Sequence, residues 1–120
     1  MFNIVFYEDK NGYSELHEYL LNLLSKSNKN KDARIQFKQF TLCIELLSKE
    51  GTMLLPTIVK HITDEIWELR PGNNRILFFY FKNNSFVLLH HFRKTTQKTP
   101  KLEIEKAKRE IIDYKIRNGG

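Results

Sequence analysis

The stretch "IWELRPGNNRILFFYFKNNSFVLLHHFRK", which begins at Ile66 and ends at Lys94, constrains the fold more than any other part of the sequence. It contains three runs rich in aromatic and β-branched residues, and such runs favour β-strands. Pro-Gly-Asn-Asn separates the first two runs and Asn-Asn separates the last two, and both are typical of tight turns. The stretch therefore predicts three consecutive strands: Ile66–Arg70, Arg75–Lys82 and Ser85–Lys94.

The rest of the chain predicts one further strand and three helices. Met1–Glu8 is short, aromatic and β-branched, which is typical of a strand. Ser14 can cap a helix in which leucines recur at helical spacing, and a second helix is expected from Asp32 to Gly51. Helical spacing returns in Lys101–Arg117, after a proline that suits a first helical turn.

Residues 52–65 show no regular pattern, and Pro56 blocks a regular helix there. The expected order is therefore β-α-α-β-β-β-α. A chain of 120 residues with 41% hydrophobic residues can form one core, so residues 1–120 are expected to form a single domain. We expect an α+β fold in which the helices pack on one face of a mainly antiparallel sheet.

The turns also predict which side chains share a face of the sheet. A two-residue turn at Asn83-Asn84 pairs Lys82 with Ser85. Counting back along the strands gives two further pairs: Leu77 with His90, and Arg75 with Phe92. Because side chains alternate, one face is apolar and is expected to form the core: Trp67, Leu69, Ile76, Phe78, Tyr80, Val87 and Leu89. The opposite face collects Glu68, Arg70, Arg75, Leu77, His90, Phe92 and Lys94, although a bulge would exchange His90 for His91.

Two arginines are expected to oppose each other across the Pro-Gly-Asn-Asn turn. Like charges in that position destabilise a strand pair by up to ~1 kcal/mol, so a carboxylate such as Glu68 or a bound phosphate should offset Arg70 and Arg75. Arginine binds phosphate oxygens in a bidentate way, and an exposed Phe92 could stack on an unpaired base. The net charge of +6 agrees with a phosphate-rich or acidic partner. An open face that is basic and aromatic predicts binding to single-stranded RNA.

Other parts of the sequence exclude several classes of protein. The chain has no apolar run of ~18 residues and no recognisable signal peptide, so neither a membrane span nor secretion is expected. Cys43 is the only cysteine, which excludes an internal disulfide and suits the cytoplasm. The four histidines lack metal-ligand spacing, so we expect neither a metal nor a cofactor.

The order and spacing of "WELR", "NRILFFYF" and "LLHHFRKTTQKTPKLEIEKAKR" resemble the RelE/HigB superfamily of toxins from type II toxin–antitoxin systems. The likeness is greatest to the HigB branch, including its phage-derived members. It implies a RelE-like fold and a ribosome-dependent mRNA interferase that cuts translated mRNA in the ribosomal A site. It also implies a cognate HigA-like antitoxin with a helix-turn-helix, through which alone the toxin would reach operator DNA.

The resemblance also assigns roles to individual residues. Arg70 and Arg75 match the arginines of the RNA-facing site, and Lys94 matches a basic residue that follows the last strand, with Arg93 beside it. Some HigB members use histidines, and His61 and His90 are the candidates here. One departure concerns the tyrosine that RelE uses beyond its last strand, because residues 95–100 contain none.

Metal-independent cleavage would begin with attack of the 2′-hydroxyl on the adjacent phosphorus. Arg70 and Arg75 would stabilise the charge on the phosphorane, and His61, His90 or Lys94 could transfer protons. The basic run from Lys98 to Arg109 could touch ribosomal RNA. Two alternatives stay open: a ParE-like toxin directed at gyrase, and a module that binds nucleic acid or antitoxin without cleavage.

Overall fold

The computed structural model describes all residues from 1 to 120. The elements, in chain order, are β1 (Asn3–Phe6), α1 (Glu15–Lys26), α2 (Lys31–Glu50), the short 3₁₀ helix η1 (Gly51–Met53), β2 (Val59–Thr63), β3 (Ile66–Leu69), β4 (Asn74–Phe81), β5 (Ser85–Arg93) and α3 (Lys101–Asn118). Side-chain caps from Ser14 and Asn30 fix the starts of α1 and α2. None of the helices is long and apolar enough to cross a membrane.

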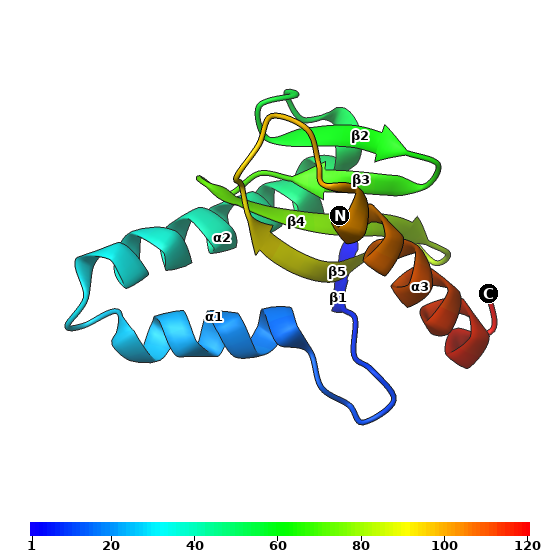
Figure 1. Ribbon diagram of the computed structural model, residues 1–120, viewed down its shortest axis with the longest axis horizontal. Coiled ribbons are helices and arrows are strands. Elements are labelled where there is room, and N and C mark those ends of the chain that lie inside the picture. Colours follow the sequence, from blue (N-terminus) through cyan, green and yellow to red (C-terminus); the bar gives the residue numbers. More distant parts are fainter.

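The five strands form one sheet in the order β1-β5-β4-β3-β2 (Figure 1). Only β1 runs parallel to its neighbour β5, and the other three pairings are antiparallel. The predicted α+β class with a mainly antiparallel sheet is therefore confirmed.

The sequence prediction missed β2, which occupies part of the stretch read as irregular. β2 pairs with β3, placing Lys60 opposite Glu68 and His61 opposite Trp67. The pairing register shifts between His61 and Thr63, so the strand lacks the strict alternation that marks a strand in sequence. Pro56 precedes β2 and does not interrupt it.

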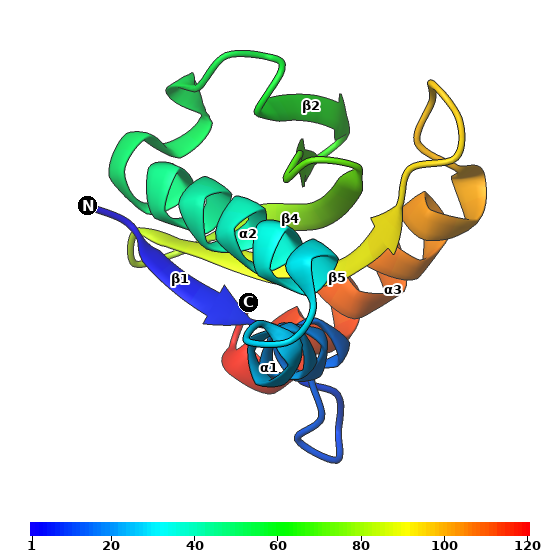
Figure 2. The same ribbon diagram turned by 90° about the vertical axis from the view of Figure 1, so that its left-hand side faces the viewer.

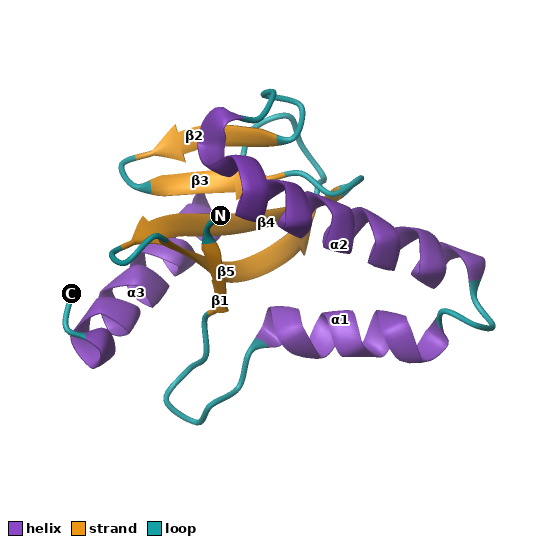
Figure 3. Ribbon diagram, turned by 180° about the vertical axis from the view of Figure 1, so that it is seen from behind, coloured by secondary structure: helices purple, strands orange, loops and turns teal.

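Helices cover both faces of the sheet, and the prediction that all of them lie on one face is wrong. α2 lies in front of the sheet in Figure 3, whereas α3 lies in front in Figure 1. The strand residues buried beneath α1 and α2 include Leu69, Ile76, Phe78, Phe86 and Leu88. Those buried against α3 include Ile66, Leu77, Phe79, Val87 and Leu89. Because both faces of β4 and β5 are apolar, each needs its own helical layer.

The register of the β4–β5 hairpin differs from the prediction at two points that compensate. Phe81 pairs with Ser85 across a three-residue loop in which Asn83 and Asn84 have positive φ. A register shift beyond Leu77 then restores the predicted pairs at the far end: Leu77 with His90, and Arg75 with Phe92. Between the loop and this shift, the side chains of β5 point to the face opposite to the predicted one. Val87 and Leu89 therefore face α3, contrary to the prediction that placed them with Ile76 and Phe78.

His90 joins α3 to the sheet and is not available as a catalytic base. Its side chain is 1% exposed, with Nδ1 2.6 Å from Glu110 Oε1 and Nε2 3.0 Å from Glu103 Oε1. Both ring nitrogens therefore have a carboxylate oxygen within hydrogen-bond distance, and neither is open to solvent or to a substrate. The predicted catalytic role of His90 is therefore contradicted by its burial and its two partners.

Replacing His90 by leucine should lower the free energy of unfolding by about 3 kcal/mol, because two glutamates would lose their buried partner. Chemical denaturation of the purified protein measures this loss. His17→Leu is the matched control, since His17 is exposed on α1 and its change should stay within about 0.5 kcal/mol. Equal stability of the two variants would show that His90 does not hold α3.

Candidate nucleic-acid interface

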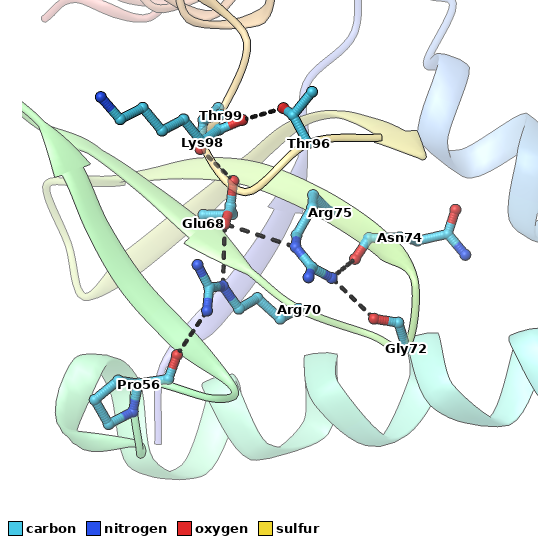
Figure 4. Close-up of polar contacts among 9 residues, drawn as sticks. All are labelled: Pro56, Glu68, Arg70, Gly72, Asn74, Arg75, Thr96, Lys98 and Thr99. Carbon is cyan, nitrogen blue, oxygen red and sulfur yellow. Dashed lines mark hydrogen bonds and ion pairs between the residues drawn. The ribbon is translucent and has the colours of Figure 1, made fainter. Parts of the chain in front are cut away.

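The side chains of Arg70 and Arg75 converge on one buried carboxylate, that of Glu68 (Figure 4). Glu68 Oε1 accepts a hydrogen bond of 3.0 Å from Arg70 Nε and lies 3.7 Å from Arg75 Nε. The expected offset of the two like charges by a carboxylate is thus confirmed. One carboxylate between two guanidinium groups still leaves one positive charge in excess.

Backbone carbonyls hold both guanidinium groups in place. Arg70 Nη1 donates to Pro56 O at 3.2 Å, and Arg75 Nη1 donates to Gly72 O and Asn74 O, each at 2.8 Å. Burial lowers the pKa of the Arg75 guanidinium, an effect that the charge of Glu68 opposes. Arginine nevertheless stays protonated in proteins, so the site presents two oriented cations.

Helix α2 fixes the turn that carries Arg75. Gln36 Oε1 accepts from Asn74 Nδ2 at 3.1 Å and from the Tyr19 hydroxyl at 2.6 Å. Asn74 is 2% exposed, so its amide depends on this partner. Gly72 has φ +61°, a backbone conformation that favours glycine. The turn is therefore held against α2 by the hydrogen bonds of Gln36, and its glycine supplies the positive φ.

A polar cavity of about 260 Å³ opens next to Arg70. Its lining residues come from β2, the position directly after β3, the loop between β5 and α3, and the start of α3: Lys60, His61, Ile62, Arg70, Gln97, Lys98, Thr99 and Ile104. The cavity joins three of the predicted residues, Arg70, His61 and Lys98, and adds Lys60. Three lining side chains carry positive charge and none is acidic, which suits an anionic ligand.

The loop between β5 and α3 closes the Arg75 end of the site; in Figure 2 it projects from the end of β5 to the start of α3. Thr99 Oγ1 donates to Glu68 Oε2 at 2.6 Å. The space enclosed by the loop, Glu68, Arg75, Phe92 and Lys94 is only about 10 Å³. RNA can therefore reach Arg75 from this side only after the loop has moved.

The sequence predicted that the sheet face carrying the arginines is open, and this prediction is wrong. α3 and the loop cover it, and Phe92 is half-buried against the residues that pack on α3. Phe92 therefore does not present a free ring for a base. Arg93 is exposed, but it lines a separate cavity of about 280 Å³ with α2 residues and does not join Arg70 and Arg75.

The remaining predicted residues lie at the rim of the site. His61 is exposed, its Nε2 lies 2.7 Å from Asp64 O, and its ring lies on Trp67 with centroids 5.0 Å apart. Lys94 is exposed, and its backbone N–H donates to Asn73 O. No group of three or more His, Cys, Asp and Glu side chains is placed to hold a metal ion.

Sequence reasoning missed Lys60 and Thr99 as parts of the site. Lys60 lies directly opposite Glu68 across β2 and β3, so both side chains project from the same face. Its place could not be found without recognising β2 as a strand. Thr99 carries no sequence signal, because its contact with Glu68 joins residues 31 positions apart.

Gln36→Met keeps the volume of the side chain but removes the acceptor for Tyr19 and Asn74. A buried amide left without a partner costs about 1–3 kcal/mol, so the free energy of unfolding should fall by that amount in urea denaturation. Gln39→Met is the control, because the Gln39 amide makes no hydrogen bond and is partly exposed. A Gln36 variant as stable as the control would refute the network.

Several solved structures are similar in fold to this chain. The structure is similar to the YoeB dimer from Staphylococcus aureus, with a TM-score of 0.50 and 11% identity over 79% of this chain and 98% of that chain. The YoeB–YefM complex from Staphylococcus aureus matches with a TM-score of 0.48 and 11% identity over 80% of this chain and 99% of that chain. The archaeal RelE–RelB complex from Pyrococcus horikoshii OT3 matches with a TM-score of 0.49 and 13% identity over 77% and 93%.

At these identities the YoeB match shows a shared fold and no more. No curated protein sequence matches the chain. The model of the family described as Phage derived protein Gp49-like matches residues 29–111, a range that runs from the end of the α1–α2 loop into α3 and contains Lys60, Glu68, Arg70, Arg75 and Thr99. The match covers more than half of the sequence, and the chain belongs to the Phage derived protein Gp49-like family.

Proposed function

We propose that this protein is the toxin of a type II toxin–antitoxin system and an endoribonuclease of the RelE superfamily. The observation that carries the proposal is the convergence of Arg70 and Arg75 beside a cavity lined by Lys60 and Lys98. The YoeB-like fold, the family match and the resemblance of the sequence to HigB toxins support it. The substrate proposed from that resemblance is translated mRNA in the ribosomal A site, and the proposed inhibitor is a HigA-like antitoxin.

Each guanidinium group retains a nitrogen for a substrate. The hydrogen bonds of Arg70 use Nε and Nη1, and Arg75 uses Nη1 for hydrogen bonds and Nε for its ion pair with Glu68, which leaves Nη2 of both side chains without a partner. Two such nitrogens can hold two oxygens of one phosphodiester. As the 2′-oxygen attacks, a second negative charge develops on those oxygens, and oriented cations stabilise that charge more than the charge of the ground state.

The lysines extend this clamp along the RNA backbone. Lys60 and Lys98 line the cavity on one side of Arg70, and the exposed Lys94 lies towards Arg75. Lysine binds phosphate as a point charge and tolerates several positions of the chain. The proposed division of labour is that the arginines hold the scissile phosphate and the lysines hold its neighbours.

The cognate antitoxin is proposed to act on the same charged surface or on the loop above it. Its DNA-binding domain would supply all contact with operator DNA. A ParE-like activity, or binding without cleavage, would leave mRNA intact while still arresting growth or sequestering a partner. Mapping of mRNA ends separates these alternatives directly.

Arg75→Ala should abolish growth arrest on induced expression and lower mRNA cleavage by about 100-fold or more, because the phosphorane would lose one of its two guanidinium groups. Primer extension on total mRNA measures the cleavage. Arg34→Ala is the matched control: it removes the same charge from an exposed position on α2 that takes no part in the site. The control should arrest growth like the wild type.

A thermal melt of the purified Arg75 variant shows whether it is still folded. If a folded Arg75→Ala protein remains fully toxic, the arginine clamp is refuted. If the wild type arrests growth and leaves mRNA uncut, the endoribonuclease function is refuted.

A further inference from the structure

We propose that Glu68 is the general base that takes the proton from the attacking 2′-hydroxyl. This inference rests on the ribonuclease function proposed above and adds the proton acceptor that the arginine clamp lacks. His90 cannot serve, because both of its ring nitrogens are occupied by glutamates in the core. His61 lines the larger cavity but not the space around Arg75, and the lysine ammonium groups are donors without a free lone pair.

The position of Glu68 fits the chemistry, since the carboxylate lies between the two side chains that would bind the scissile phosphate. Oε1 faces Arg70 Nε and Arg75 Nε, and the free Nη2 atoms belong to the same two guanidinium groups. A phosphate held by those groups would bring the adjacent ribose towards the carboxylate that lies between them. Glu68 is the only acidic side chain among the residues that line this end of the site.

The second oxygen of Glu68 already receives a hydroxyl. Thr99 Oγ1 donates to Oε2 at 2.6 Å, which is the contact that a ribose 2′-hydroxyl must make before it loses its proton. Thr99 lines both the cavity of about 260 Å³ and the small space around Arg75, so it stands between them. Displacement of Thr99 would open Oε2 to the larger cavity, and the substrate hydroxyl would replace the threonine hydroxyl.

The groups that face Glu68 are otherwise cationic. Arg70 directly follows β3, Arg75 lies on β4, Lys60 on β2, and Lys94 and Lys98 in the loop. Its charged neighbours carry hydrogen-bond donors, whereas the oxygens of Glu68 can accept a proton.

The proposed step is balanced in atoms and electrons. The 2′-oxygen forms a bond to phosphorus while its proton passes to Glu68 Oε2. The bond from phosphorus to the 5′-oxygen breaks, and that oxygen keeps the electron pair and takes a proton from the ammonium group of Lys60 or Lys98. The products are a 2′,3′-cyclic phosphate and a 5′-hydroxyl. Transfer of a proton from the carboxylic acid to the lysine, through water, restores the starting state.

The test measures single-turnover cleavage of mRNA on ribosomes in a purified translation system, with the ends mapped by primer extension. Glu68→Gln should lower the rate constant by about 100-fold or more, the usual contribution of a general base. The toxin concentration that gives half of the maximal cleavage rate should change by less than about threefold, because the amide oxygen of Gln at position 68 can still accept a hydrogen bond from Arg70. Glu65→Gln, at an exposed carboxylate paired with Lys115, is the matched control and should cut like the wild type.

A pH profile separates a base from a residue that only positions the arginines. The wild-type rate should fall at acidic pH as the carboxylate becomes protonated, and this acidic limb should be absent from the residual rate of Glu68→Gln. Glu68→Asp keeps a carboxylate at a greater distance, so it should be slower than the wild type but keep the limb.

The outcomes distinguish this inference from the function on which it rests. If the wild type cuts no mRNA, the proposed function fails and the inference fails with it. If the wild type cuts and Glu68→Gln cuts within about threefold of it, only the inference is overturned. The inference is also overturned if Glu68→Gln cleaves less mRNA because it binds more weakly, while its rate still falls at acidic pH as in the wild type. Glu68 would then be a residue that positions the arginines. Should the glutamine variant fail to fold, the rate and pH profile of Glu68→Asp decide between these outcomes.

Discussion

The contact of Arg70 and Arg75 with Glu68 is the interaction on which the candidate site depends. Two guanidinium groups at the mouth of one hairpin repel each other, and the strand pair tolerates them because a carboxylate of the same face lies between them. That carboxylate is almost fully buried, so the loss of either arginine would leave a buried negative charge without one of its two cationic partners. Charge balance and chemistry therefore depend on the same three side chains.

The layers around the sheet explain why this cluster is both fixed and enclosed. α2 holds the turn beneath Arg75 through Gln36, while α3 covers the opposite face and is joined to β5 by His90. The loop between β5 and α3 must cross the end of the sheet, and there Thr99 meets Glu68. The connection that completes the fold thus also covers the site, which makes access of RNA dependent on movement of that loop.

The sequence predicted the arginine pair and its carboxylate because these depend on local parity and one turn. It failed at His90 and Phe92, because α3 determines their surroundings. The alternation of side chains along the strands assigns both residues to one face of the sheet, but it does not show that α3 covers that face. The pairs of Leu77 with His90 and of Arg75 with Phe92 were right only because a longer loop and a bulge compensate. Neither irregularity has a clear sequence signal, since Asn-Asn suits turns of both lengths.

By itself the sequence determined the elements from β3 to β5, the helices, and the gathering of positive charge at one hairpin, because periodicity and turn chemistry act over a few residues. Only the tertiary structure decided that β2 adds Lys60, that α3 removes His90 from the surface, and that Thr99 contacts Glu68. These contacts join residues far apart in the chain. Their energies depend on burial and on which layer covers which face, and neither is encoded in local spacing.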